Sequence, residues 1–84
     1  MKKTVHELKI LPEFYDEVRF GNKKFELRKN DRNFQKGDIL RLKEWSGNRY
    51  TGEELDVVVR YILHDYDWIG LQEGYCIMSI DTCV

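Results

Sequence analysis

Apolar and polar residues alternate with the two-residue period of a β-strand in several short segments of this 84-residue chain. Glycine, asparagine and aspartate are concentrated between these segments, as expected for turns. The clearest segment runs from residue 54 to 63 and is rich in β-branched side chains. The pattern predicts strands over residues 5–10, 24–29, 39–45, 54–63 and 75–80.

One short helix is predicted between the first two strands. Pro12 suits the first helical position, where a missing N–H costs least, and Gly21 is a typical residue at a helix end. Phe14 and Val18 are four residues apart and therefore share a helix face. The chain thus starts with a strand, a helix and a second strand.

So many short strands in so few residues favour a partly closed barrel, because closure protects strand edges. We expect residues 1–84 to form a single α+β domain, a small mixed β-barrel of about five to six strands with one or two short helices. Phe34 is expected to pack the loop at residues 30–33 onto the core, and Cys76 to be a core residue. Trp45 is also expected to pack in the core.

The cysteines and histidines show no zinc signature. Cys76 and Cys83 form no Cys-x-x-Cys pair, and His6 and His64 lie far from both in sequence. We therefore expect no metal and no cofactor. The apolar runs are too short for a membrane span and no signal segment is recognisable, so we expect a soluble, cytoplasmic protein without a membrane partner.

The strand predicted at residues 24–29 has two different faces. Phe25 and Leu27 point to one side, and Lys24, Glu26 and Arg28 point to the other. We expect the apolar face to pack and the charged face to be presented for function. Charged strand faces are often simply solvated, and Glu26 and Arg28, roughly 7 Å apart, are also placed for structural ion pairs with other strands.

Charge is distributed unevenly along the chain. Residues 1–49 contain 13 Lys and Arg against 8 Asp and Glu, whereas residues 50–84 contain 1 against 7. The basic first part favours an anionic partner, although the two parts could instead pair across the fold. The net charge of −1 argues against strong, non-specific binding to a nucleic acid duplex.

The motif Gly21-x-Lys23-x-x-Glu26-x-Arg28 resembles the signature of ASCH domains, a branch of the PUA-like β-barrel superfamily. The resemblance covers nearly the whole chain, and it is strongest to the small bacterial and phage proteins of the DUF3850 family. The other matching segments are His6-Glu7-Leu8-Lys9, Pro12, Asn30-Asp31-Arg32-x-Phe34, Gly37-Asp38 and Tyr50-Thr51-Gly52. The resemblance implies a barrel with a cleft beside the helix, the signature at that cleft, and binding of RNA or nucleotides.

The residue types at these positions suit that role. Arg28 can bind a phosphate or base edge bidentately, and Lys23 supplies a point charge. Glu26 can accept a hydrogen bond from an exocyclic amine. An exposed aromatic residue such as Tyr50 can stack on a base. The candidate binding residues are Lys23, Glu26, Arg28, Arg32, Lys9 and Tyr50.

Two other functions are compatible with the sequence. Some ASCH-like relatives are amidohydrolases that remove the acyl group of N4-acylated cytidines with a lysine, a threonine and a glutamate. Lys23 matches their lysine, but Glu26 stands where they have threonine, so catalysis here would use Lys23 to polarise a water and Glu26 as base. The third hypothesis is a protein-interaction module. The sequence does not set the oligomeric state.

Overall fold

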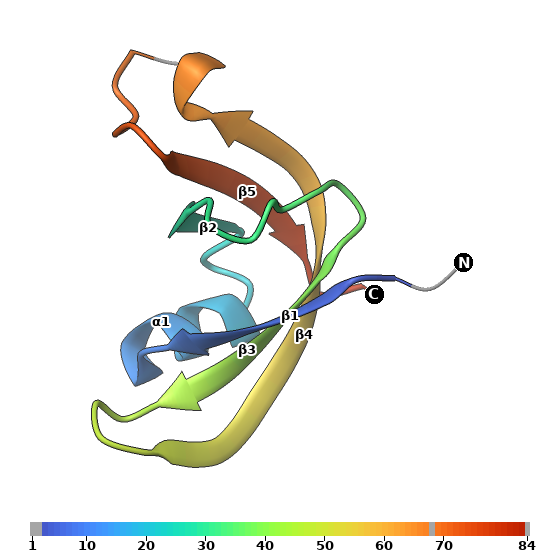
Figure 1. Cartoon of the computed structure of the whole chain (residues 1–84). Helices are drawn as coiled ribbons and strands as arrows, with labels where there is room; N and C mark the ends of the chain where they lie inside the picture. The colour runs from blue at the N-terminus through green and yellow to red at the C-terminus, as the bar shows by residue number, and fades with distance from the viewer. Residues whose placement is uncertain (1–2, 68, 84) are drawn as a thin grey trace.

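The computed structural model describes residues 3–67 and 69–83. Its elements confirm the predicted strands and helix, and the fourth strand begins at Tyr50 rather than Glu54. The elements in chain order are β1 (Val5–Ile10), α1 (Pro12–Arg19), β2 (Phe25–Lys29), β3 (Ile39–Trp45), β4 (Tyr50–His64), the short 3-10 helix η1 (Asp65–Asp67) and β5 (Tyr75–Asp81), as Figure 1 shows.

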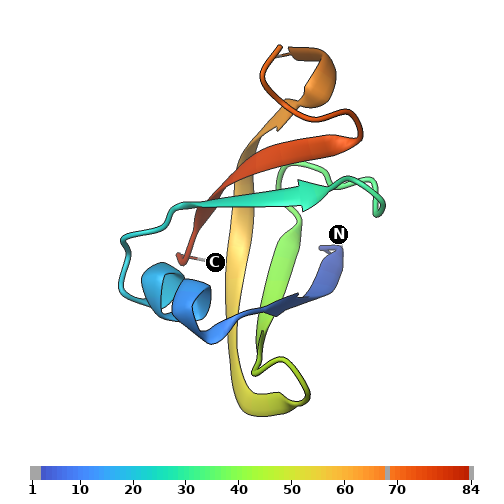
Figure 2. The same ribbon diagram turned by 90° about the vertical axis from the view of Figure 1, so that its left-hand side faces the viewer.

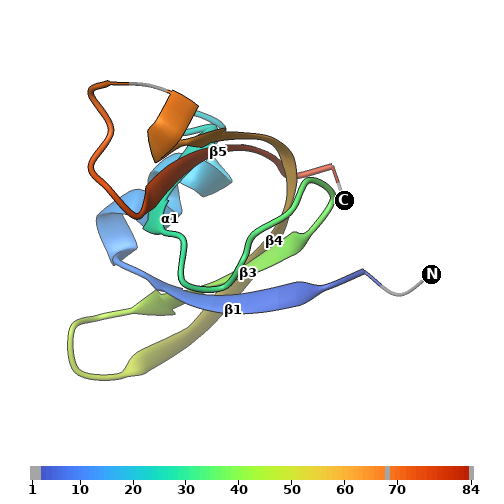
Figure 3. The same cartoon turned by 45° about the horizontal axis from the view of Figure 1, so that its top comes forward.

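The strands form one five-stranded sheet in the order β1-β3-β4-β5-β2. β1 and β3 are parallel, and the other neighbours are antiparallel. The long strand β4 pairs with β3 through its first part and with β5 through its second, and its ladders shift register near Trp45 and Tyr61. Such irregularities bend a sheet. The sheet is curled into a half-barrel, with α1 beside its open side (Figures 1 and 3).

The core lies on the concave side of the sheet and is built from alternate strand residues. Leu40 and Leu42 of β3 are fully buried, as their shared face predicts. Cys76 is buried in β5, and Phe34 is buried beneath the segment between β2 and β3, so both predictions are confirmed. Trp45 remains only half-buried at the end of β3, because its side chain lies on the outer face.

Helix α1 carries the chain from β1 to β2. Pro12 occupies its first turn, and Tyr15 and Val18 face the core. At its end Gly21 adopts φ +82°, a conformation that glycine reaches without steric cost, and the N–H groups of Asn22 and Lys23 donate to Glu17 O. This compact ending directs the chain into β2. No helix in the described ranges is long and apolar enough to cross a membrane.

Candidate functional site

The two edge strands of the sheet, β1 and β2, face one another across the opening of the half-barrel. Figure 2 shows β2 beside β5 on one side, with α1 and β1 on its other side. The Arg28 guanidinium bridges the two edges, because its Nη2 donates to Lys9 O at 2.7 Å. A cleft of about 470 Å³ lies here, between the edges and the start of α1. We call it the seam cleft; its lining includes Lys9, Ile10, Leu11 and Phe14, and residues 23 and 25–28.

A buried carboxylate lies at the centre of the polar part of the seam cleft. Glu26 is only 3% exposed, and both of its oxygens are bound by cations. Lys23 Nζ donates to Oε1 at 2.5 Å, and Arg28 Nε donates to Oε2 at 2.8 Å. Lys23 Nζ also donates to Phe25 O at 2.7 Å. These three side chains, which we call the Glu26 cluster, hold a net charge of +1 at a fixed position.

The faces of β2 are oriented opposite to the prediction. Glu26 and Arg28 lie on the core side of the sheet, where Glu26 is paired with the buried Met78. Phe25 and Leu27 point to the other side and are 49% and 52% exposed. Because β2 is an edge strand, its inner face borders the opening of the half-barrel. There the Lys23 and Arg28 side chains pair with the buried Glu26 carboxylate, so this charged face can point inward. The prediction that the apolar face packs was therefore wrong.

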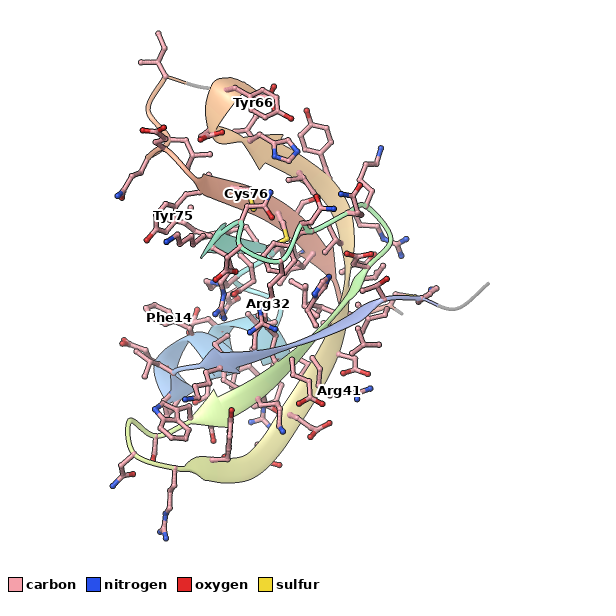
Figure 4. All side chains as sticks on the ribbon, in the orientation of Figure 1. Phe14, Arg32, Arg41, Tyr66, Tyr75 and Cys76 are labelled. Atoms are coloured by element: carbon pink, nitrogen blue, oxygen red, sulfur yellow. The ribbon has the colours of Figure 1, made fainter. Side chains whose placement is uncertain are left out.

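Two aromatic side chains lie near the Lys23 ammonium. Its Nζ lies 4.8 Å from the ring centroid of Phe25 and 5.9 Å from that of Phe14. Phe14 projects from α1 toward the space beside β2 (Figure 4) and is 43% exposed. The sequence analysis grouped Phe14 with Val18 on one helix face. Adjacent helical residues point about 100° apart, and in the structure Tyr15 is the residue that is buried with Val18.

The side chains of three other candidate binding residues lie outside the Glu26 cluster. Lys9 contributes its main-chain carbonyl to the cleft, while its Nζ lies 3.9 Å from the ring centroid of Trp45 on the outer face. Tyr50 contacts Trp45 edge-on and lines a separate hollow with residues 46, 48, 49 and 51. Arg32 is exposed in the segment after β2 and is not among the residues lining the seam cleft.

A second polar contact fixes the start of β1. His6 Nε2 lies 2.8 Å from Asp38 Oδ2, which also accepts the Gln35 N–H at 2.9 Å. The His6 ring packs edge-on against Phe34, with 4.8 Å between the ring centroids. Both polar side chains are largely buried, so this contact holds the segment before β3 against β1. It thereby positions one edge of the seam cleft.

The ion pairs between the basic and acidic parts of the chain converge on Arg41. Arg41 Nε donates to Asp56 Oδ1 at 2.9 Å and lies 3.5 Å from Glu54 Oε2. The hydrogen bond to Asp56 raises the pKa of Arg41. Within residues 3–67 and 69–83, the ion pairs that connect the two parts all involve Arg41. Pairing across the fold therefore accounts for only a small part of the uneven charge.

The described residues contain no group of three or more His, Cys, Asp or Glu side chains placed to hold a metal ion. The residues lining the seam cleft include no Ser, Thr, Cys or His. Cys76 is buried, and burial raises the pKa of its thiol. Lys23 and Glu26 are in direct contact in this cleft, and such a pair is chemically able to act on a water molecule.

The chain matches known proteins over nearly its whole length. The family described as a domain of unknown function, DUF3850, matches residues 5–80, which include all residues lining the seam cleft. The chain is also similar to an uncharacterized 12.9 kDa protein in the GpA 3' region of Escherichia phage P2, with 35% identity over 69 residues. This match covers 82% of the chain and 63% of the phage protein.

Proposed function

The chain belongs to the DUF3850 family, and we propose that it is an ASCH-type module of the PUA-like superfamily that binds RNA or nucleotides in the seam cleft. The observation that carries this proposal is the Glu26 cluster, where one buried carboxylate holds two cations and one of them, Lys23, lies near the exposed rings of Phe14 and Phe25. The half-barrel with a cleft beside its helix is also the arrangement that an ASCH-type module would have.

The two cations retain capacity for an anionic ligand. The Lys23 and Arg28 side chains are 18% and 25% exposed, so solvent and ligands reach them. A guanidinium has five N–H donors, and the bonds to Glu26 and Lys9 O use two of those of Arg28. The other donors suit a phosphate oxygen or the acceptors on a base edge. Glu26 fixes the direction of both side chains, which reduces the ordering cost of binding.

The apolar walls distinguish this site from a simple basic patch. Phe14 and Phe25 leave much of their rings exposed at the cleft, together with Leu11 and Leu27. Stacking of an unpaired base on an aromatic side chain contributes about 1–3 kcal/mol. Cations beside exposed rings therefore match the phosphate and the base of one nucleotide, which favours a single strand over a duplex.

The test is an amide chemical-shift titration of labelled protein with short single-stranded RNA and with mononucleotides. We expect saturable shifts at residues 9–11 and 23–28. Lys23→Ala and Phe14→Ala should each weaken binding, whereas Tyr61→Ala serves as the matched control, because Tyr61 is an exposed aromatic residue outside the cleft lining. The absence of saturable shifts at millimolar ligand would contradict the proposal.

The direct Lys23–Glu26 contact favours one second candidate, an amidohydrolase acting on N4-acylated cytidines. In that reaction Lys23 would polarise a water and Glu26 would accept its proton. The measurement is acetate release from N4-acetylcytidine by the parent protein and by Glu26→Gln. Release that stops in the variant would support catalysis, and no release by the parent protein would remove this substrate class.

A further inference from the structure

The main chain of β2 presents its polar groups in two directions. Ile80 N–H donates to Lys24 O, and Asn30 N–H donates to Gly74 O, at the two ends of the β2–β5 ladder. In an antiparallel pair, alternate residues exchange hydrogen bonds with the neighbouring strand. The even-numbered residues of β2 therefore bond to β5. The N–H and C=O groups of Phe25, Leu27 and Lys29 point toward the open edge.

Leu27 offers a main-chain donor and acceptor at the seam cleft. Of the open-edge residues of β2, Phe25 and Leu27 line the cleft, and Phe25 O already accepts from Lys23. On the facing edge, Lys9 O accepts from Arg28. The two cations of the Glu26 cluster therefore each donate to one main-chain carbonyl, on β2 and on β1 respectively. The Leu27 N–H and C=O lie side by side, as in a closely spaced ladder pair, and no hydrogen bond among residues 3–67 and 69–83 outside the strand ladders uses them.

We propose that the Leu27 main chain binds the Watson–Crick edge of an unpaired nucleobase, and that the ligand of the seam cleft is therefore single-stranded. This inference rests on the proposed function. Each base carries a hydrogen-bond donor next to an acceptor on this edge, which complements adjacent N–H and C=O groups. A base in a duplex has already used these groups.

The position of Leu27 agrees with the rest of the site. It lies between Glu26 and Arg28 in sequence, so a base bound at its main chain brings the attached phosphate near the cations. The side chains of Phe14 and Phe25 stand beside the same cleft to cover the base. An extended peptide strand could also bond to Leu27, but the neighbouring cations favour a ligand that carries phosphate.

Proline scanning of the open edge tests the inference. Leu27→Pro removes the proposed donor but no bond to β5, and an edge strand tolerates proline at such a position. Lys29→Pro is the matched control, because it removes an open-edge N–H outside the cleft lining. We expect Leu27→Pro to weaken binding of a five-nucleotide uridine RNA about tenfold, and Lys29→Pro to bind within about twofold of the parent. Leu27→Val keeps the main-chain donor and should bind more tightly than Leu27→Pro.

A modified ligand tests the same contact in the parent protein, even if Leu27→Pro fails to fold. N3-methyluridine RNA of the same length is uncharged at the base but has lost its Watson–Crick donor. We expect it to bind about tenfold more weakly than uridine RNA. Equal binding of methylated, unmodified and double-stranded RNA would overturn the inference and leave the proposed function standing. Binding of an acidic peptide with no response to any RNA would overturn both.

Discussion

Arg28 Nη2 donates to Lys9 O at 2.7 Å, a contact that joins the two edges of one curled sheet. The same guanidinium holds Glu26 through its Nε. One side chain therefore closes part of the opening of the half-barrel and also presents positive charge in the seam cleft. Stability and binding must be measured together at this residue, because a loss of binding alone would not separate the two roles.

Arg28→Ala should lower the free energy of unfolding by about 2–3 kcal/mol, because it leaves a Glu26 oxygen and Lys9 O without their donors. Arg28→Lys should recover only part of this loss, since an ammonium cannot reproduce the fork of the guanidinium. Urea denaturation measures both. The control Arg32→Ala, at an exposed residue, should stay within about 0.5 kcal/mol of the parent. Equal effects of Arg28→Ala and Arg32→Ala would contradict a bridging role.

Glu26→Gln should change stability and binding in opposite directions. Loss of the buried carboxylate leaves Lys23 and Arg28 without their common partner, so the free energy of unfolding should fall by about 3 kcal/mol. The net charge of the Glu26 cluster rises by one, so a phosphate-bearing oligonucleotide should bind more tightly at low salt. Calorimetric titration at two salt concentrations checks this prediction. Weaker binding by a folded Glu26→Gln protein would show that Glu26 contacts the ligand itself.

Tyr50→Ala should leave the affinity of the seam cleft within about twofold of the parent, because Tyr50 lies in a different hollow. Lys9→Ala should also have little effect on affinity, since its contribution to the cleft is a main-chain carbonyl. It should cost about 0.5–1 kcal/mol of stability through its lost contact with Trp45. A strong loss of RNA binding in either variant would extend the site across the outer face.

Phe34→Ala should lower the free energy of unfolding by about 3–5 kcal/mol, the usual cost of removing a buried aromatic side chain. The variant also loses the edge contact with the His6 ring. Phe34→Leu, which fills more of the space, should cost clearly less. Chemical denaturation of the two variants measures the difference, and similar small losses in both would mean that Phe34 does not anchor this segment.

Stability should fall in alkali because of two buried groups. Burial raises the pKa of the Cys76 thiol above its ordinary value of 9.0 and that of Tyr15 above 10.0. As pH rises past these values, the unfolded state ionises first and is favoured. The stability that depends on the protonated groups is complete below pH 9 and is lost as pH rises through their folded-state pKa values. Urea midpoints between pH 7 and 11 test this, with Cys76→Ala expected to flatten the profile.

The sequence predicted the strands, the helix, and the burial of Phe34 and Cys76, because those predictions depend on local periodicity. Its prediction of which face of β2 looks inward was wrong. Alternation separates Phe25 and Leu27 from Glu26 and Arg28, but only the pairing with β5 and the curl of the sheet decide which face meets the opening. The exposure of Phe14 at the seam cleft was also not predicted, because the sequence does not show that the neighbouring Tyr15 is the residue that fills the core.

The pairing of β2 has a consequence for the order in which the protein acquires its site during synthesis. Residues 23–28 leave the ribosome early, but in the part of the chain that the structure describes β2 pairs with β5 at Tyr75–Asp81 alone. Until those residues emerge and pair, Glu26 has no sheet to hold its backbone, and the two edges cannot face one another. A nascent chain that stops before β5 therefore carries residues 23–28 without the seam cleft that these residues line.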